Sequence, residues 1–500
     1  MTGPRRGIAA TLAAIALATA AWMGARSHGA GGRPSTAEAR GIFPATFSSD
    51  VRAQAVDALA ADARLREDRF LEAVQPGRAF GWTRAGQKDI LAGRWPVADL
   101  YEMGAQLFHL SFTRQVGYGA RDLPPIARFQ RGRRGGPDAQ RCDSCHWRGG
   151  GAGAGDAADD AYLQGDGDSQ SSALARNPIA LSGAGILEIV ARQMTAELER
   201  QRDAALAAAR ASGAASSAYL QTNGVSFGRL VARPDGTLDV RDVAGVDPDL
   251  AIKPFGWKGN MATVRDAVED ALLVHHGMES DYLVRSAPPE RTGPFDPRDP
   301  DGDGVAPEID EGQVTALTLF VAMQEVPSVE MPSEPNMVPL LAAGRTQLAT
   351  LGCASCHVPS ITFDDSLFRL PSRTGGGEVT VDLREAGAEP RLERDAQTGR
   401  FRAFLYSDLR RHDLGAALAE PRDDRGVAGA MFLTPPLWGV ARSRPYLHDG
   451  RAATLEDAIL AHGGEAKEAR DAYARLQDSD RAPLRVFLTS LSRARRLAVR

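Results

Sequence analysis

The sequence predicts a mainly α-helical protein built from two similar domains in tandem, with small β hairpins and long loops. Three observations support this prediction. Apolar residues recur at helical spacing in several segments. The motif C-x-x-C-H occurs twice, at residues 142–146 and 353–357. A stretch of similar sequence follows each motif, which indicates that one unit has been duplicated.

The two C-x-x-C-H motifs use all four cysteines of the 500-residue chain. This spacing is the signature of covalent c-type haem attachment, in which both thiols form thioethers and the histidine binds iron. A zinc site or two redox disulfides would not explain the histidine after each cysteine pair. We therefore expect two cytochrome-c-like domains with two covalently bound haems. The expected attachment residues are Cys142, Cys145, Cys353 and Cys356, and the expected proximal iron ligands are His146 and His357.

The N-terminus has the pattern of a secretory signal peptide. Arg5 and Arg6 precede an alanine-rich apolar run, and small residues that could form a cleavage site follow. The run is nearly long enough to span a bilayer, so an uncleaved membrane anchor is the alternative. We expect residues 1–30 to be removed from a periplasmic or otherwise exported protein, because bacteria attach c-type haem outside the cytoplasmic membrane.

Composition limits the partners and the domain organisation. The formal net charge of −5 argues against nucleic acid as a partner. The 52 glycines and 30 prolines fit long ordered loops around cofactors. We expect a helical extension over residues 31–95, a first haem domain with a linker over residues 96–330, and a second haem domain over residues 331–500.

Hydrophobic periodicity and turn residues predict the main elements of both domains. The sequence predicts helices over residues 50–71, 97–110, 186–211, 338–351 and 482–495. It predicts a hairpin whose strands include residues 225–227 and 238–240, and a strand pair near residues 378–383 and 401–406.

The repeat becomes visible when the two haem motifs are set in register. Residues 255–268 follow the first motif and correspond to residues 446–459 after the second. Thr263 and Thr454 occupy the same position and are expected to be helix N-caps. Histidines come next in each half: His275 and His276 in the first, and His462 in the second.

Several motifs together resemble the bacterial dihaem cytochrome c peroxidase/MauG superfamily, and more closely its dihaem oxidoreductase (thiol-oxidoreductase-like) branch. They are T-P-P-L-W-G-V at residues 434–440, P-Y-L-H-D-G at 445–450 and A-T-L-E at 453–456, with further matches at 185–188, 255–258, 407–409 and 412–415. The resemblance covers about residues 95–495. It implies that electrons pass between the haem at His357 and a reactive haem at His146.

For the second haem, the resemblance places the distal iron ligand on the helix after the P-Y-x-H-D-G loop. That position is His462, where relatives carry Met or Tyr, and a bis-histidine iron would be closed to peroxide. The alternative is a surface histidine at a helix end. His448 in relatives contacts the haem edge or propionates rather than iron, and His412 would lie near the same haem.

At the first haem the position equivalent to His462 is Ala271, which cannot bind iron. His275 follows one helical turn later, where peroxidase relatives carry an acid–base carboxylate. His275 is therefore the candidate catalytic residue, because it could move the proton that O–O cleavage needs. It could also bind the iron, or do neither. Met278 and His109 are lesser candidates for the distal side.

A second metal signal lies between the two halves. Residues 299–310 fit the spacing of a calcium loop, with carboxylates at positions one, three and five, a glycine at six and a backbone carbonyl at seven. An acidic linker between domains is the alternative. The expected calcium ligands are Asp299, Asp301, Asp303, Val305 and Asp310.

These observations leave three functions open. The first is an exported dihaem oxidoreductase of peroxidase type, with hydrogen peroxide or a small molecule as substrate and a small redox protein or other electron donor or acceptor as partner. The second is an electron-transfer cytochrome whose two irons are six-coordinate. The third is a MauG-like enzyme that modifies another protein. A membrane is expected as a partner only if the N-terminal segment is not cleaved.

Overall fold

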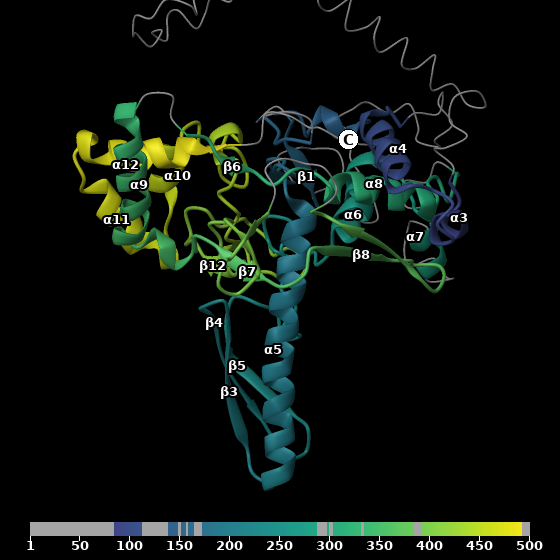
Figure 1. The fold of residues 1–500 in the computed structure, drawn as a ribbon, viewed down its shortest axis with the longest axis horizontal. Coiled ribbons are helices and arrows are strands. Elements are labelled where there is room, and N and C mark those ends of the chain that lie inside the picture. The colour runs from purple at the N-terminus through teal and green to yellow at the C-terminus, as the bar shows by residue number, and fades with distance from the viewer. Residues whose placement is uncertain are drawn as a thin grey trace, which may run out of the picture. The chain divides into compact units, whose positions relative to one another are not determined.

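The computed structural model describes residues 85–112, 139–148, 152–156, 159–164, 173–287, 298–299, 304–331, 335–384 and 392–492 (Figure 1). All of them belong to the compact unit Gly81–Arg500, one of two into which the chain divides. The predicted signal peptide, the N-terminal extension up to residue 84 and the predicted helix over residues 50–71 lie outside the described residues. Within the described residues, no helix is both long enough and apolar enough to cross a membrane.

The described helices account for most of the predicted ones. Predictions over residues 97–110, 186–211 and 338–351 are confirmed, whereas the last helix begins at Asp478 and ends at Ser490. In chain order the helices are α3 (Gln87–Leu91), α4 (Val97–His109), α5 (Ala184–Ser212), α6 (Val264–His276), α7 (Asp281–Ser286), α8 (Glu311–Ala322), α9 (Val338–Thr350), α10 (Leu455–Ala461), α11 (Lys467–Ala474) and α12 (Asp478–Ser490). Short 3-10 turns include η3 (Cys142–Ser144) and η7 (Cys353–Ser355), which are the haem motifs themselves.

The strands form small antiparallel sheets. The larger two are β3 (Ser216–Thr222), β4 (Val225–Ala232) and β5 (Leu238–Val243), and β10 (Glu393–Arg394), β11 (Phe401–Ala403) and β7 (Ile361–Phe363). The pairs are β1 (Ala161–Leu163) with β2 (Leu174–Arg176), β8 (Leu367–Pro371) with β9 (Glu378–Asp382), β12 (Arg411–Asp413) with β13 (Met431–Leu433), and β6 (Ser328–Val329) with β14 (Leu491–Ser492). The predicted β4–β5 hairpin is confirmed.

The predicted pairing of the strands near residues 378–383 and 401–406 is wrong. Both strands exist, but β9 pairs with β8 and β11 pairs with β7 and β10. Alternating side chains identify a strand without identifying its partner. The β8–β9 pair closes a much shorter loop, which costs less chain entropy.

One close helix crossing in each half uses glycine in the same way. Gly104 of α4 lies so near α8 that a Cβ would overlap the carbonyl oxygen of Ala316 and lie 2.7 Å from Phe320 Cβ. Gly344 of α9 lies so near α12 that a Cβ would overlap the carbonyl oxygen of Pro483 and lie 2.6 Å from Phe487 Cβ. In both partners the contacts are four residues apart, so the two halves repeat one packing arrangement.

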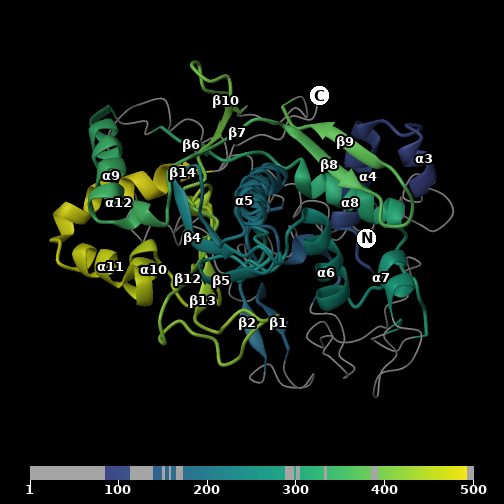
Figure 2. The same cartoon turned by 90° about the horizontal axis from the view of Figure 1, so that it is seen from below.

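Helix α5 packs along the β3–β4–β5 sheet, as both views of the fold show (Figures 1 and 2). Leu198 of the helix and Phe227 and Leu230 of the sheet are buried. The first turns of α5 are buried on all sides, whereas its later turns are mainly exposed on the face away from the sheet. The same helix therefore joins the sheet to the region around the two haem motifs.

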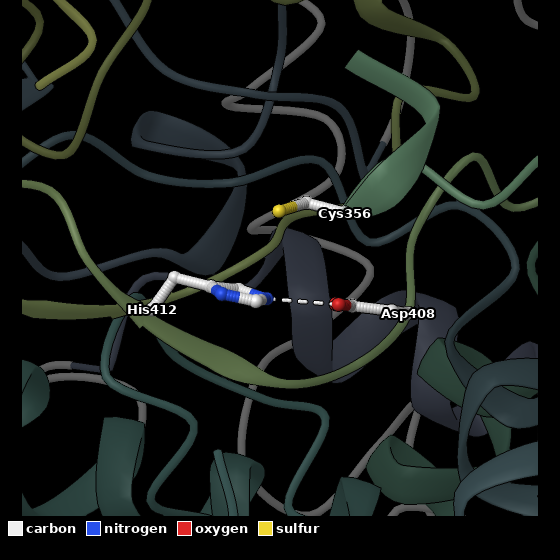
Figure 3. A group of neighbouring side chains, drawn as sticks. All are labelled: Cys356, Asp408 and His412. Atoms are coloured by element: carbon white, nitrogen blue, oxygen red, sulfur yellow. Dashed lines mark hydrogen bonds and ion pairs between the residues drawn. The ribbon is translucent and has the colours of Figure 1, made fainter. Parts of the chain in front are cut away.

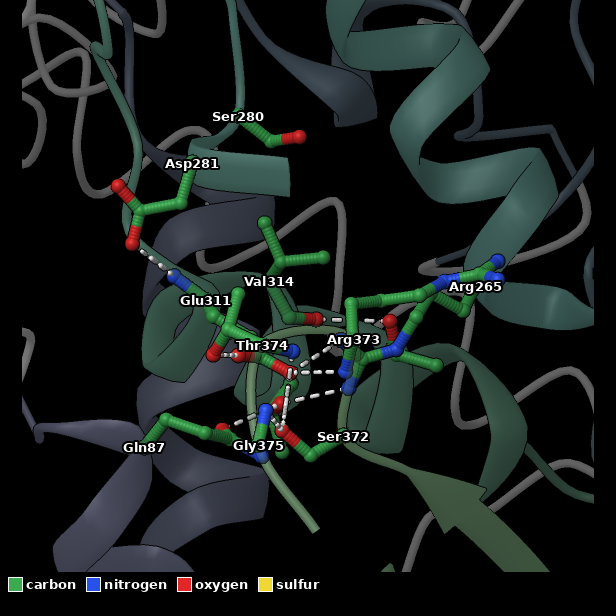
Figure 4. Close-up of polar contacts among 12 residues, drawn as sticks. Gln87, Arg265, Ser280, Asp281, Glu311, Val314, Ser372, Arg373, Thr374 and Gly375 are labelled. Carbon is green, nitrogen blue, oxygen red and sulfur yellow. Dashed lines mark hydrogen bonds and ion pairs between the residues drawn. The ribbon is translucent and has the colours of Figure 1, made fainter. Parts of the chain in front are cut away.

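A buried carboxylate fixes the loop after β8 against helices of the first half (Figure 4). Glu311, at the start of α8, accepts hydrogen bonds from Ser372 Oγ at 2.8 Å, from the Arg373 backbone N–H at 2.6 Å and from the Thr374 hydroxyl. Arg265 of α6 lies 3.4 Å from the same carboxylate. A segment of the predicted second domain is thereby held on two helices of the first.

The close crossing at Gly344 gives a stability prediction. Gly344→Ala should destabilise the protein by about 1–3 kcal/mol, because the added methyl group meets backbone in a packed core. Gly376→Ala is the control, since no atom lies within 4 Å of its would-be Cβ and its φ is not positive. Thermal unfolding of both variants measures the difference. Equal melting temperatures would contradict the inferred crossing.

Candidate functional site

His357 of the second C-x-x-C-H motif has the hydrogen bonds and the neutral charge that a metal-binding histidine needs. The His357 backbone N–H donates to the Cys353 carbonyl at 2.9 Å, which closes the η7 turn. Its Nδ1 donates to the Tyr406 carbonyl at 3.0 Å, so Nε2 keeps its lone pair. Burial lowers the pKa of His357 to about 4. A neutral imidazole held by Nδ1–H has the tautomer that an iron ligand needs.

The first motif repeats this arrangement. The His146 backbone N–H donates to the Cys142 carbonyl at 3.0 Å, and its Nδ1 lies 3.0 Å from the Ile179 carbonyl and 3.2 Å from the Gly153 carbonyl. Burial lowers the pKa of His146 to about 4. Both predicted proximal ligands therefore share one tautomer and one kind of partner.

A cavity of about 850 Å³ opens beside the second motif. Its size is in the range of cofactor pockets. Apolar side chains from α9, α10, α12 and the segment 435–440 form much of its wall. The cysteines and histidines that line it are Cys353, Cys356, His357, His412, His448 and His462. The cavity therefore gathers every residue that the sequence assigned to the second haem.

His462, the predicted distal ligand, lines the same cavity as His357. It follows the last residue of α10, and its Nδ1 donates to the Ala458 carbonyl at 2.7 Å. Burial lowers the pKa of His462. The imidazole is neutral and its Nε2 is available, as in His357. With two such histidines and two cysteines on one apolar cavity, the residues fit a covalently attached haem.

His448 is buried in the same wall and has a different environment. Its ring lies against Phe432, with the two centroids 4.6 Å apart. Lys258 Nζ lies 3.6 Å from the centroid of the Phe432 ring. Burial lowers the pKa of His448 to about 4, so it too is neutral. Its predicted contact with the haem edge stays a prediction.

The two repeated loops have the same backbone. Phe255 bridges to Met261 in the first, and Tyr446 bridges to Ala452 in the second. The predicted N-caps are confirmed: the hydroxyl of Thr263 accepts from the Asp266 N–H, and that of Thr454 accepts from the Asp457 N–H.

Asn177 joins the two repeated loops, and sequence reasoning did not identify it. Its backbone N–H donates to the His448 carbonyl at 2.7 Å, and its own carbonyl accepts from Trp257 Nε1 at 2.8 Å. Trp257 and His448 hold equivalent positions in the repeat. Asn177 and Trp257 also line the cavity. No sequence pattern marks this role of Asn177, because Trp257 and His448 are more than 75 residues away in the chain.

At the first motif the structure brings His276 against a haem-attachment cysteine. His276 is buried, its Nδ1 donates to the Ala139 carbonyl at 2.8 Å, and its Nε2 lies 3.6 Å from Cys142 Sγ. Burial lowers its pKa to about 4. Sequence reasoning selected the neighbouring His275, which is half-buried. Only the rotation of α6 distinguishes the two. The catalytic role of His275 stays a prediction.

The lesser distal candidates have other surroundings. His109 Nδ1 lies 2.8 Å from Asp143 Oδ2, within the first motif, and the His109 side chain is 43% exposed. Met278 is fully buried. His109 therefore contacts the first motif through Asp143.

His412 lies at the wall of the cavity between two carboxylates, of which Figure 3 shows Asp408. Its Nε2 is 2.8 Å from Asp408 Oδ2 and its Nδ1 is 2.7 Å from Glu465 Oε2. Burial lowers the pKa of His412, but the hydrogen bonds that its ring donates to these carboxylates outweigh that effect and raise the pKa to about 10. His412 is thus the charged exception among the histidines of the cavity.

The predicted calcium loop is described only in part. Asp299 Oδ2 accepts from the Gly304 N–H at 3.2 Å. Asp310 caps α8 by accepting from the Gln313 N–H at 2.8 Å. Val305 is half-buried, and Asp301 and Asp303 lie outside the described residues. Calcium binding stays a prediction.

Comparison with known proteins agrees with the geometry of the second motif. Residues 340–491 match the family described as "Di-haem oxidoreductase, putative peroxidase". This segment is therefore similar in sequence to a di-haem oxidoreductase domain. The matched segment includes the second C-x-x-C-H motif and His462. No curated protein has a sequence that matches this chain significantly.

Two solved structures resemble parts of the chain distantly. Hydrazine synthase from Kuenenia stuttgartiensis, in crystals pressurised with xenon, has 14% identity and a TM-score of 0.33, covering 79% of this chain and 93% of the other. A MauG-like protein associated with microbial copper homeostasis has 16% identity and a TM-score of 0.26, covering 64% and 92%. Neither score is high enough to establish a shared fold.

The start of α6, the helix that carries His275 and His276, depends on a buried carboxylate. The Val264 N–H donates to Glu188 Oε2 at 2.7 Å, and burial raises the pKa of Glu188 to about 7. The folded protein therefore binds this proton more tightly than the unfolded chain, and stability falls as pH rises from about 4.5 to 7.

Glu188→Gln should remove this pH dependence, because the amide oxygen can still accept from Val264 and does not titrate. The variant should gain stability relative to the unmodified protein across that interval, and the difference should level off above it. Urea unfolding at several pH values measures this. Glu199→Gln, at a partly exposed position on the same helix, is the control. Parallel stability curves for Glu188→Gln and the unmodified protein would contradict the assignment.

Proposed function

We propose that this protein is an exported dihaem c-type cytochrome that acts as a peroxidase-type oxidoreductase. The observation that carries the proposal is the shared state of His146 and His357, each neutral, buried and held through Nδ1 by a backbone carbonyl. The histidines of both C-x-x-C-H motifs have the same tautomer and the same kind of hydrogen-bond partner. This similarity supports one haem at each motif. The di-haem oxidoreductase domain at residues 340–491 supports the class of reaction.

The two sites have different tasks in this proposal. Bound haem would supply the electron exchange that side chains cannot. At the second site His357 and His462 would both bind the haem iron, which would exclude peroxide and leave this haem to electron transfer. At the first site Ala271 leaves the equivalent position without a ligand, so peroxide can enter there. A small redox protein or another external donor provides the electrons.

Reduction of one peroxide to two waters consumes two electrons and two protons. The residues at the first site must therefore deliver protons as well as exclude side reactions. His275 is the predicted acid–base residue, and His276 is the neutral imidazole that the structure places beside Cys142. Both belong to the last turn of α6, so one helix carries the groups proposed for proton transfer.

One observation favours the alternative of an electron-transfer cytochrome. His276 carries its proton on Nδ1, as His462 does, and its Nε2 lies 3.6 Å from Cys142 Sγ of the first motif. If His276 or His275 bound the first iron, both irons would be six-coordinate and no site would admit peroxide. The two proposals differ in the spin state of one haem.

Spectroscopy of the purified protein separates them. Optical and EPR spectra should contain one low-spin and one high-spin haem in the oxidised protein, and peroxide should change the high-spin signal. Two low-spin haems that ignore peroxide would favour the electron-transfer cytochrome.

Removal of the thioether cysteines tests haem attachment at the second motif. The double variant Cys353→Ser with Cys356→Ser should lose one of two covalent haems, because the first motif is independent in sequence. Mass spectrometry of the intact protein counts them. The matched variant Cys142→Ser with Cys145→Ser should lose the other haem. A variant whose mass still includes two haems would refute covalent attachment at the altered motif.

His462→Gly tests the distal ligand. Loss of the imidazole should convert one low-spin haem to high-spin, because its iron loses the sixth ligand. His448→Gly, on the wall of the same cavity, should leave both axial ligands in place and serves as the control. If the His462→Gly spectrum equals that of the unmodified protein, His462 does not bind iron.

A further inference from the structure

The His412 side chain carries a fixed positive charge for a geometric reason. An ionised carboxylate can only accept hydrogen bonds, so an imidazole bonded to a carboxylate at each nitrogen must hold both protons. Asp408 lies at Nε2 and Glu465 lies at Nδ1. Asp408 is 1% exposed and His412 is 5% exposed, whereas the Glu465 side chain is 50% exposed.

This charge lies next to a haem-attachment cysteine. One ligand atom each from Cys356, Asp408 and His412 lie within 4.8 Å of one another (Figure 3). Such a group could hold a metal ion, but the C-x-x-C-H motif uses the cysteine and both His412 nitrogens already have partners. The group is therefore better explained as a charge placed at the thioether side of the cavity.

We propose that His412 sets the reduction potential of the haem attached to Cys353 and Cys356. The inference rests on the proposed function, because it requires haem at the second motif. A haem that gains an electron loses one positive charge, and a nearby cation stabilises that reduced form. The interaction is strong because few water molecules can screen a charge that is this deeply buried. His412 therefore raises the potential, while Asp408 and Glu465 hold its ring in place.

The same geometry gives the carboxylates an opposing effect. Asp408 and Glu465 are anions, and each favours the oxidised haem. The cluster as a whole thus carries one positive and two negative charges, with Glu465 partly screened by solvent. Removal of the cation and removal of an anion should shift the potential in opposite directions. A purely structural role for His412 predicts no such change of sign.

The test is a spectroelectrochemical titration of the full-length protein with both haems attached. His412→Gln should lower the midpoint potential of one haem and leave that of the other unchanged, because the amide is neutral and can still form a hydrogen bond. Ser443→Ala is the matched control, since it changes a neutral side chain that lines the same cavity and has no predicted contact with haem. It should cause no shift of comparable size.

Glu465→Gln removes a negative charge and tests the shift in the opposite direction. Glu465 tolerates substitution better than His412, because its side chain is half exposed. Asp408 still holds the His412 proton in this variant, so the potential of the same haem should rise. If His412→Gln fails to fold, the shift in the midpoint potential of the Glu465→Gln variant tests the inference by itself. Shifts of the same sign in both variants, or no shift, would overturn the inference. If the unmodified protein carried no haem at Cys353 and Cys356, both the proposed function and this inference would be wrong. If haem is attached there but neither variant changes its midpoint potential, only the role of His412 would be wrong.

Discussion

The hydrogen bond from a histidine Nδ1 to a backbone carbonyl is the interaction on which both candidate sites depend. It holds His146, His357, His462 and His276, at 2.7–3.0 Å for the closest carbonyl. Because a carbonyl cannot donate, the proton is fixed on Nδ1 and the lone pair on Nε2. Burial then keeps each ring neutral, since a charged imidazole would lose its hydration. Direction, tautomer and charge of each potential ligand follow from one contact.

His412 shows what happens when the partner changes. Carboxylates replace the carbonyl, both nitrogens become donors and the ring becomes a cation. In this cavity the neutral His357 and His462 differ from the charged His412 in their hydrogen-bond partners. This explains why the residue type in the sequence did not distinguish their roles.

Duplication explains the scaffold, and substitution explains the difference between the two sites. Gly104 and Gly344 allow equivalent helix crossings, and Thr263 and Thr454 cap equivalent helices. In the aligned repeat the same sequence position is Ala271, within α6, in one half and His462, the C-cap residue of α10, in the other. A single side chain therefore changes the coordination that each site can offer. Asn177 connects the two repeated loops through its hydrogen bonds to His448 and Trp257.

The sequence by itself determined the two haem motifs, the main helices, the repeat, its N-caps and the candidate ligand His462. These depend on local chemistry: thioether spacing, helical periodicity and capping act over a few residues. Only the tertiary structure decided that β9 pairs with β8, that His276 faces Cys142, that Asn177 joins both loops and that His412 lies between Asp408 and Glu465. Their partners are distant in the chain or depend on how a helix is rotated. Neither spacing nor periodicity specifies such contacts, because both describe one segment at a time.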